Sequence, residues 1–316
     1  MNFEKLQMIA INNHGSGSKV YQSFFDNHPE ICMIPGYQLM YLYPHWFQWK
    51  KNKKINTWDQ ILNNLKFNHP SLFDSREFPG SESLDKLGNQ QDEFIQVNFK
   101  KFKSCFLNYT KDKAISSKNL ILAIHYSYYY TLDINMKKLK IILYHIHVPY
   151  YINDFLIKDF PNLKVITLIR DIRGYIYRKF NNGFLKTDMN KLNLSDFILI
   201  KSTRFKYTFQ TFCDSLDYLK SINIKNQRVV KHEDLIFRFD DMILNTLKFM
   251  DISYDNSLKY LTFGSKKWKT SFYNFDKSYN VNPEIISNKW QTEMSKIDIF
   301  FIEGVFYDFL VYYNYK

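Results

Sequence analysis

The segment that decides the fold reads Ile9-Ala10-Ile11-Asn12-Asn13-His14-Gly15-Ser16-Gly17-Ser18-Lys19-Val20. It starts as a short apolar run, passes through a turn of small residues, and continues as the start of a helix. Such a turn directs the free N–H groups of the first helical turn into the loop, where they can bind an anion. The side chains of Ser16 and Ser18 add hydroxyl donors, and Lys19 adds a positive charge. The stretch therefore predicts an anion-binding loop at residues 15–19.

Other short apolar runs indicate that the first strand belongs to a buried sheet. Strands that are covered on both faces are continuously apolar, whereas half-exposed strands alternate. We expect strands at residues 7–11, 120–124, 140–144, 164–169 and 228–231. Segments with helical spacing lie at residues 20–25, 150–160, 172–180, 195–221 and 240–250. This alternation predicts an α/β fold in which helices flank a right-handed, central parallel sheet.

Residues 37–118 depart from this alternation, because they are polar and aromatic and carry turn signals at Asn68-His69-Pro70 and Phe78-Pro79-Gly80. We interpret them as a mixed insertion after the first strand and helix, helical around residues 58–65. An insertion here either carries acceptor specificity or covers the core. The sequence shows no repeat and no low-complexity linker, so we expect a single domain over residues 1–316.

Composition narrows the class of protein. The hydrophobic share of 45% and charged share of 23% are typical of a globular chain. The net charge of +12 favours anionic partners, which include nucleic acid, a membrane surface and a phosphorylated donor. Three widely spaced cysteines argue against a disulfide framework and a zinc site. There is no signal-peptide pattern and no apolar run of about 18 residues, so we expect a cytoplasmic protein without stable membrane insertion.

A longer stretch, Ser16-Gly17-Ser18-Lys19-Val20-Tyr21-Gln22-Ser23-Phe24-Phe25-Asp26-Asn27-His28-Pro29, resembles the opening motif of one enzyme family. The family is the sulfotransferases that use 3′-phosphoadenosine-5′-phosphosulfate (PAPS), whose motif reads R/K-S-G-S/T-T-x-L/F-x-x-x-L/F-x-x-H-P. The resemblance implies that Gly15, Ser16, Gly17, Ser18 and Lys19 bind the 5′-phosphosulfate. Gly15 stands where the family has a basic residue, and Lys19 stands where it has its second Thr.

A second stretch, Leu168-Ile169-Arg170-Asp171-Ile172-Arg173-Gly174-Tyr175-Ile176-Tyr177-Arg178, is similar to the family's R-D-P-R-x-x-x-x-S motif. The resemblance implies that Arg170 binds the 3′-phosphate of the donor, with Arg178 in the place of the Ser that shares this role. The chemistry agrees with this assignment. Arg170 ends an apolar run, ligands of open α/β sheets bind at the carboxyl ends of strands, and a guanidinium binds phosphate through paired hydrogen bonds.

Further matches extend the resemblance in order along the whole chain, weakest over residues 37–118. They are His147-Val148-Pro149, Phe160-Pro161-Asn162-Leu163-Lys164, His232-Glu233-Asp234-Leu235, Lys289-Trp290 and Tyr313-Asn314-Tyr315. They are similar to the family's K-T-P, F-P-x-A-K, Y-E-D-L, K-W-R and G-Y, respectively. The resemblance implies a P-loop-like three-layer fold that binds PAPS, releases 3′-phosphoadenosine-5′-phosphate (PAP) and needs no metal.

Sulfuryl transfer resembles phosphoryl transfer, in which positioning and charge stabilisation do most of the work. Lys19 would stabilise charge on the leaving phosphate, and a general base would take the proton from a hydroxyl or amine acceptor. The candidates for the base are His147 and His125, each at the end of an expected strand, with His45 in the insertion as a third. The acceptor is expected to be a small molecule or glycan, and the oligomeric state stays open.

Other functions remain open at this point. A P-loop kinase would need the Walker pattern G-x-x-x-x-G-K-S/T, which is absent because Ser18 follows Gly17 and Val20 follows Lys19. A basic module that binds nucleic acid would show affinity that falls steeply with salt. A relative that binds the donor without turning it over is the remaining alternative.

Overall fold

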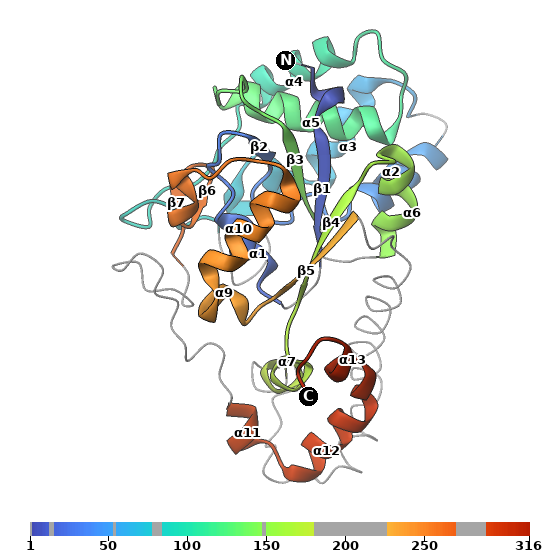
Figure 1. Cartoon of the computed structure of the whole chain (residues 1–316). Coiled ribbons are helices and arrows are strands. Elements are labelled where there is room, and N and C mark those ends of the chain that lie inside the picture. Colours follow the sequence, from blue (N-terminus) through green and yellow to red (C-terminus); the bar gives the residue numbers. More distant parts are fainter. Residues whose placement is uncertain are drawn as a thin grey trace.

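A computed structural model describes residues 2–12, 16–52, 55–77, 84–146, 150–179, 226–269 and 289–316. Its centre is a five-stranded sheet in the order β2-β3-β1-β4-β5, in which every pair of neighbours is parallel (Figure 1). The strands are β1 (Gln7–Asn12), β2 (Ile31–Met33), β3 (Ile141–Ile146), β4 (Lys164–Ile169) and β5 (Gln227–Lys231). The predicted central parallel sheet is thus confirmed.

The register of the sheet brings several loops to one edge. Asn12, the last residue of β1, lies opposite Ile146 of β3 and Thr167 of β4. Ile169, the last residue of β4, lies opposite Lys231 of β5. Because carboxyl ends of parallel strands share an edge, the loops that follow β1, β3, β4 and β5 leave the sheet on the same side.

Helices lie on both sides of the sheet, which makes three layers. Figure 1 shows α1 and α10 on the left of the sheet and α2 and α6 on the right. The helices are α1 (Ser18–Ser23), α2 (Leu42–Lys51), α3 (Trp58–Asn68), α4 (Phe99–Thr110), α5 (Ser117–Thr131), α6 (Tyr150–Asp159), α7 (Ile172–Lys179), α9 (Asp234–Phe237), α10 (Phe239–Met250), α11 (Lys289–Glu293), α12 (Lys296–Val305) and α13 (Tyr307–Tyr312).

The strands expected at residues 7–11, 140–144, 164–169 and 228–231 are confirmed as β1, β3, β4 and β5. The strand expected at residues 120–124 is wrong, because this run lies inside α5. Ser116 caps the helix by accepting a hydrogen bond from the backbone of Asn119. α5 contacts β2, α4 and α6, so the helix is apolar nearly all round and its sequence resembles a buried strand. The helix expected at residues 195–221 lies outside the described residues.

The insertion is mainly helical and lies between β2 and β3 in the chain. The helix expected around residues 58–65 is confirmed as α3, which begins with a reciprocal capping box between Thr57 and Gln60. β2 was not predicted, because its three residues are too few for a periodic signal. β2 is an edge strand, and Tyr129 covers its outer side. The Tyr129 hydroxyl accepts a hydrogen bond from the Met33 N–H (2.9 Å) and donates one to the Ile31 carbonyl (3.1 Å).

A two-stranded antiparallel hairpin follows α10, formed by β6 (Thr262–Phe263) and β7 (Lys266–Lys267). Both residues of its turn, Gly264 and Ser265, have positive φ angles of 58° and 62°. Such backbone angles match the right-handed twist of a tight hairpin.

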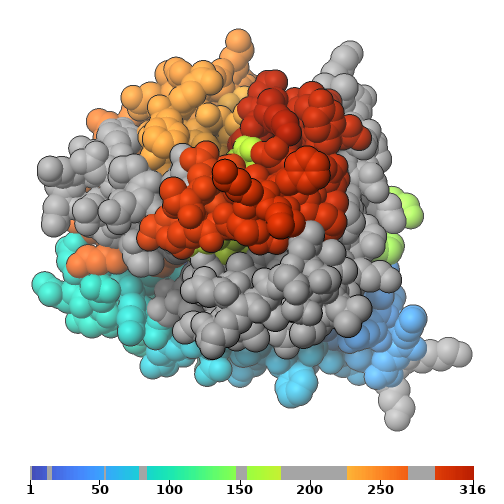
Figure 2. Space-filling view, turned by 90° about the horizontal axis from the view of Figure 1, so that it is seen from below, coloured from blue at the N-terminus to red at the C-terminus, as the bar shows by residue number. Residues whose placement is uncertain are grey.

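The C-terminal helices pack on α7. α11 and α12 both contact α7, and a second apolar cluster joins Ile169 and Tyr175 to Trp290 and Phe309. Figure 2 shows the red C-terminal segment lying across this face of the molecule, beside the orange residues of α9 and α10. No helix in the described part of the chain is both long and apolar enough to cross a bilayer.

Candidate active site

The loop after β1 is buried where the structure describes it. Ser16 and Ser18 are 2% and 3% exposed, and Gly17 precedes α1 with a φ of 79°. That backbone angle is in the left-handed region, which favours glycine. Gly15 lies outside the described residues. Because α1 has only six residues, its dipole is small, and cationic side chains must supply most of the attraction for an anion.

Arg170 and Arg178 bring two positive charges together at the carboxyl edge of the sheet. Arg170 follows β4 and is 3% exposed, whereas Arg178 lies on α7. Burial lowers the pKa of the Arg170 guanidinium, and the nearby charge of Arg178 lowers it further, against the opposing effect of Glu233. Like charges held together in a buried place are unfavourable unless an anion binds between them. Asp171, the residue after Arg170, also opposes the effect of Arg178.

His232, which follows β5, joins the loop to these arginines. Its backbone N–H donates to the Ile169 carbonyl (2.7 Å), and its buried ring lies against Gly17. Burial lowers the pKa of the imidazole to about 3, and the charges of Arg170 and Arg178 contribute, while the Ser16 backbone opposes the shift. Neither ring nitrogen has a hydrogen-bond partner of normal geometry within the described ranges. The sequence marked this position only as part of a strand-ending motif.

Lys19 is buried in the first turn of α1, with 4% of its surface exposed. Its Nζ lies 5.0 Å from the centre of the Trp268 ring and 5.7 Å from that of Phe263. The Lys19 charge also acts on His145, at the end of β3. Burial lowers the pKa of the His145 imidazole to about 3, and the positive charge of Lys19 contributes to this shift.

His145 is held by a residue of α1. Gln22 donates from Nε2 to the Ile34 carbonyl (3.0 Å), so its Oε1 is left to accept from His145 Nδ1 (3.1 Å). This contact fixes the hydrogen of the neutral imidazole on Nδ1. His147, the candidate base two residues further on, lies outside the described residues.

The remaining histidine candidates lie away from strand ends. The premise that placed His125 at the end of a strand is wrong, because His125 lies within α5, where its Nδ1 contacts the Ile121 carbonyl (2.8 Å). Burial lowers the pKa of His125 to about 4. His45 lies on α2, and its Nδ1 is 3.0 Å from Nε2 of His69. Neither ring is shown in contact with the loop or the arginines.

Acidic residues that follow β4 and β5 have a supporting role. Glu233 accepts hydrogen bonds from the Asp171 N–H (3.0 Å) and from the Tyr315 hydroxyl (2.7 Å). Arg173 binds Asp171 and Glu303, and Nη2 of Arg173 also donates to the Tyr315 carbonyl (3.0 Å). These contacts hold the segment that carries Arg170 against the C-terminal helices.

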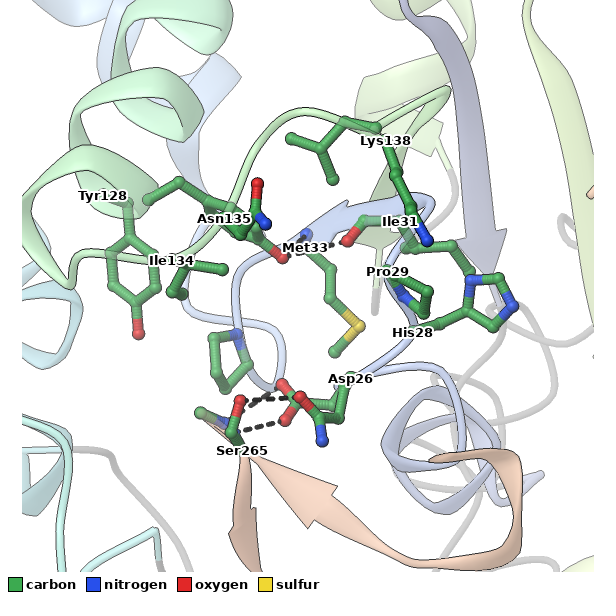
Figure 3. Close-up of a pocket in the computed structure, with 15 residues that line it drawn as sticks. Asp26, His28, Pro29, Ile31, Met33, Tyr128, Ile134, Asn135, Lys138 and Ser265 are labelled. Carbon is green, nitrogen blue, oxygen red and sulfur yellow. Dashed lines mark hydrogen bonds between the residues drawn. The ribbon is translucent and has the colours of Figure 1, made fainter. Parts of the chain in front are cut away.

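A cavity of about 300 Å³ lies apart from the arginines and the loop. Asp26, Met33, Tyr128 and Lys138 are among the residues that line it, and Figure 3 shows them around the open space. None of the residues of the anion site lines this cavity. Within the described ranges, no cluster of three His, Cys, Asp or Glu side chains could hold a metal ion.

No protein-family model matches the sequence, and no curated protein sequence matches it either. Among solved structures, the chain is similar to the sulfotransferase domain of the Synechococcus PCC 7002 olefin synthase, at 13% identity and a TM-score of 0.48, over 92% of this chain and 90% of that one. It is similar to the sulfotransferase domain from the curacin biosynthetic pathway, at 14% identity and a TM-score of 0.40, over 84% and 81%. A sulfotransferase from Alicyclobacillus acidocaldarius matches at 9% identity and a TM-score of 0.42, over 84% and 86%.

Proposed function

We propose that this chain is a sulfotransferase that moves a sulfuryl group from PAPS to a hydroxyl or amine acceptor. The observation that carries the proposal is the convergence of Arg170 and Arg178 beside the loop after β1. Burial lowers the pKa of Arg170 and the nearby charge of Arg178 lowers it further, so a bound anion would stabilise the charged pair. PAPS carries phosphate groups at both ends of its ribose, which suits a site with cations on neighbouring strand ends.

In the proposed reaction, Arg170 and Arg178 hold the 3′-phosphate, and Ser16, Gly17 and Ser18 hold the 5′-phosphosulfate. Lys19 stabilises the negative charge that develops on the leaving phosphate as the sulfur–oxygen bond breaks. Because Lys19 is buried, its charge acts through a medium that screens it less than water does. We assign the base that takes the acceptor proton to His147, which follows β3 by one residue. His125 is not carried forward, since its ring is buried within α5.

The acceptor is proposed to be a small molecule or a glycan, and a saccharide hydroxyl is the first class to test. The proposal requires a nucleotide donor and no metal, and it includes no role for nucleic acid. A cytoplasmic location stays a prediction. A kinase is the less favoured alternative. It would rely on a Walker lysine and Mg²⁺ ligands, and the Walker pattern is absent from the loop sequence.

The test is thermal unfolding of the protein with PAP, with ATP–Mg²⁺ and with AMP. A ligand that binds only the folded state adds roughly 2.7 kcal/mol at a hundred times its dissociation constant. We expect a rise in Tm with PAP that is absent with AMP and absent from the Arg170→Met variant. Stabilisation by ATP–Mg²⁺ alone would favour a kinase, and no shift with any nucleotide would overturn the proposed donor site.

A further inference from the structure

The ammonium of Lys19 lies between two aromatic rings that come from the hairpin of β6 and β7. Trp268 and Phe263 present their faces at 5.0 and 5.7 Å from Nζ, and the two ring centres are 4.8 Å apart. Trp268 is 3% exposed and Phe263 is fully buried, so water does not weaken these contacts. An ammonium over a desolvated indole ring is held by the negative face of its π system.

The hairpin that carries these rings is itself fixed to the helix that carries Lys19. Asp26, just beyond α1, is 8% exposed and accepts hydrogen bonds from the N–H groups of Gly264 (3.0 Å) and Ser265 (2.8 Å). Figure 3 shows the Asp26 carboxylate facing the turn at Ser265, with dashed lines between them. The carboxylate therefore fixes the turn of the hairpin at one end of α1, while Lys19 meets the rings at the other end.

Backbone contacts fix Trp268 from its other side. Its N–H donates to the Leu261 carbonyl (2.9 Å), and it forms an isolated bridge with Leu87 of the insertion. The Gly88 N–H donates to the Lys267 carbonyl (2.7 Å). The backbone of Trp268 is thus held against both the insertion and the start of the hairpin, and its indole is buried beside Lys19.

We propose that Trp268, supported by Phe263, is a positioning residue that holds the Lys19 ammonium at the leaving phosphate. This role rests on the proposed function. It also accounts for a lysine at position 19, whereas the family has its basic residue at the position of Gly15. The rings restrain Nζ without neutralising its charge, whereas a carboxylate partner would compete with the donor's phosphate.

The test is a double-mutant cycle on Lys19→Met and Trp268→Leu, with the release of PAP from PAPS in water as the reaction. Trp268→Leu should lower kcat by about tenfold and leave the Kd for PAP within about threefold, because the ring acts through a charge needed in the transition state. Trp268→Phe keeps an aromatic face and should restore most of the activity. In the Lys19→Met background, Trp268→Leu should have no further effect.

The matched control is Trp58→Leu, which removes a tryptophan that packs on Phe106 in the insertion. Its effect should be small and should add to that of Lys19→Met. Additive effects of Trp268→Leu and Lys19→Met would overturn the proposal, as would equal losses in Trp268→Phe and Trp268→Leu.

A second measurement is independent of turnover and separates this inference from the proposed function. Acetylation of lysines, followed by mass spectrometry, reports how well each amine is protected, with the exposed Lys50 as an internal standard. Trp268→Leu should raise the rate of acetylation of Lys19 by about tenfold relative to that of Lys50. An unchanged Lys19 rate would overturn the positioning role. If wild-type protein fails to bind PAP while Lys19 still depends on Trp268, the proposed function fails and the structural restraint stands.

Discussion

The ring of His232 lies against Gly17 so closely that a Cβ built on the glycine would be 2.5 Å from Nδ1 of the histidine. The loop after β1 and the residue after β5 therefore fit only if position 17 has no side chain. Since the φ of Gly17 is also positive, two independent constraints require glycine here. This contact joins the loop after β1 to the imidazole of His232, which lies near Arg170.

Gly17→Ala should accordingly disrupt the anion site. The left-handed backbone alone costs roughly 1–2 kcal/mol for a residue with a Cβ, and the clash with His232 adds to this. We expect a lower Tm and PAP affinity reduced by at least about tenfold, measured by thermal unfolding and titration calorimetry. Adding His232→Ala should recover part of the Tm, because it removes the clash but not the backbone cost. No recovery in the double variant would contradict this explanation.

Arg178→Ser places at this position the residue that the resemblance leads one to expect. We predict PAP affinity weaker by about tenfold. The variant loses one charge-assisted hydrogen bond of roughly 1.5–3 kcal/mol, and the serine hydroxyl replaces only part of it. The affinity should also depend less on salt. Arg238→Ser is the control, since Arg238 is exposed and pairs with Asp241 on the surface. Equal affinities in the Arg178→Ser variant and the wild type would remove Arg178 from the site.

Buried histidines should make the fold sensitive to acid. Burial lowers the pKa of His69 and His125 to about 4 and that of His145 to about 3, whereas an unfolded histidine titrates near 6.5. As the pH falls below about 6.5, the unfolded chain takes up protons that the folded chain does not, so the free energy of unfolding falls until the folded pKa values are reached. We expect a loss of about 1–2 kcal/mol per histidine between pH 7.5 and 5, measured by urea unfolding.

His125→Gln should flatten this pH dependence, since it removes one titrating group from α5. His45→Gln is the comparison, because His45 is only half-buried and should contribute less. If the His125→Gln variant kept the pH dependence of the wild type, the acid sensitivity would have another source.

The C-terminal tyrosine should stabilise the Arg170 segment. Tyr315→Phe removes the hydroxyl that donates to Glu233 and should lower the free energy of unfolding by about 1–2 kcal/mol. It should also weaken PAP binding slightly, because Glu233 holds the N–H of Asp171 next to Arg170. Tyr312→Phe is the matched control, since Tyr312 is 75% exposed. Equal Tm values for both variants and the wild type would argue against this link.

The parallel sheet was predictable because β1, β3 and β4 are buried on both faces and carry a nearly unbroken apolar signal. The same signal misled the assignment of residues 120–124, since a helix enclosed by β2, α4 and α6 is apolar on every side. β2 escaped notice because three residues cannot display a period. Burial by tertiary neighbours, which a single sequence does not report, decided the case of residues 120–124.

The position of Arg170 was predictable, because a motif places this residue directly after an expected strand. Arg170 follows β4 as expected, and Arg178 acts on it from α7. His232 was not assigned a role, because it acquires one only when the end of β5 folds against the loop. No spacing in the chain relates Trp268 to Lys19, and only the hairpin fixed by Asp26 brings them together.

The hydroxyl of Tyr129 occupies the place where a further strand would pair with β2. An edge strand with unpaired N–H and carbonyl groups can recruit an extended segment from another molecule. Here the outward N–H of Met33 and carbonyl of Ile31 are already taken by one phenol. A strand added on that side would first have to displace this phenol, which α5 holds in place, so the edge of the sheet at β2 is protected against β-augmentation.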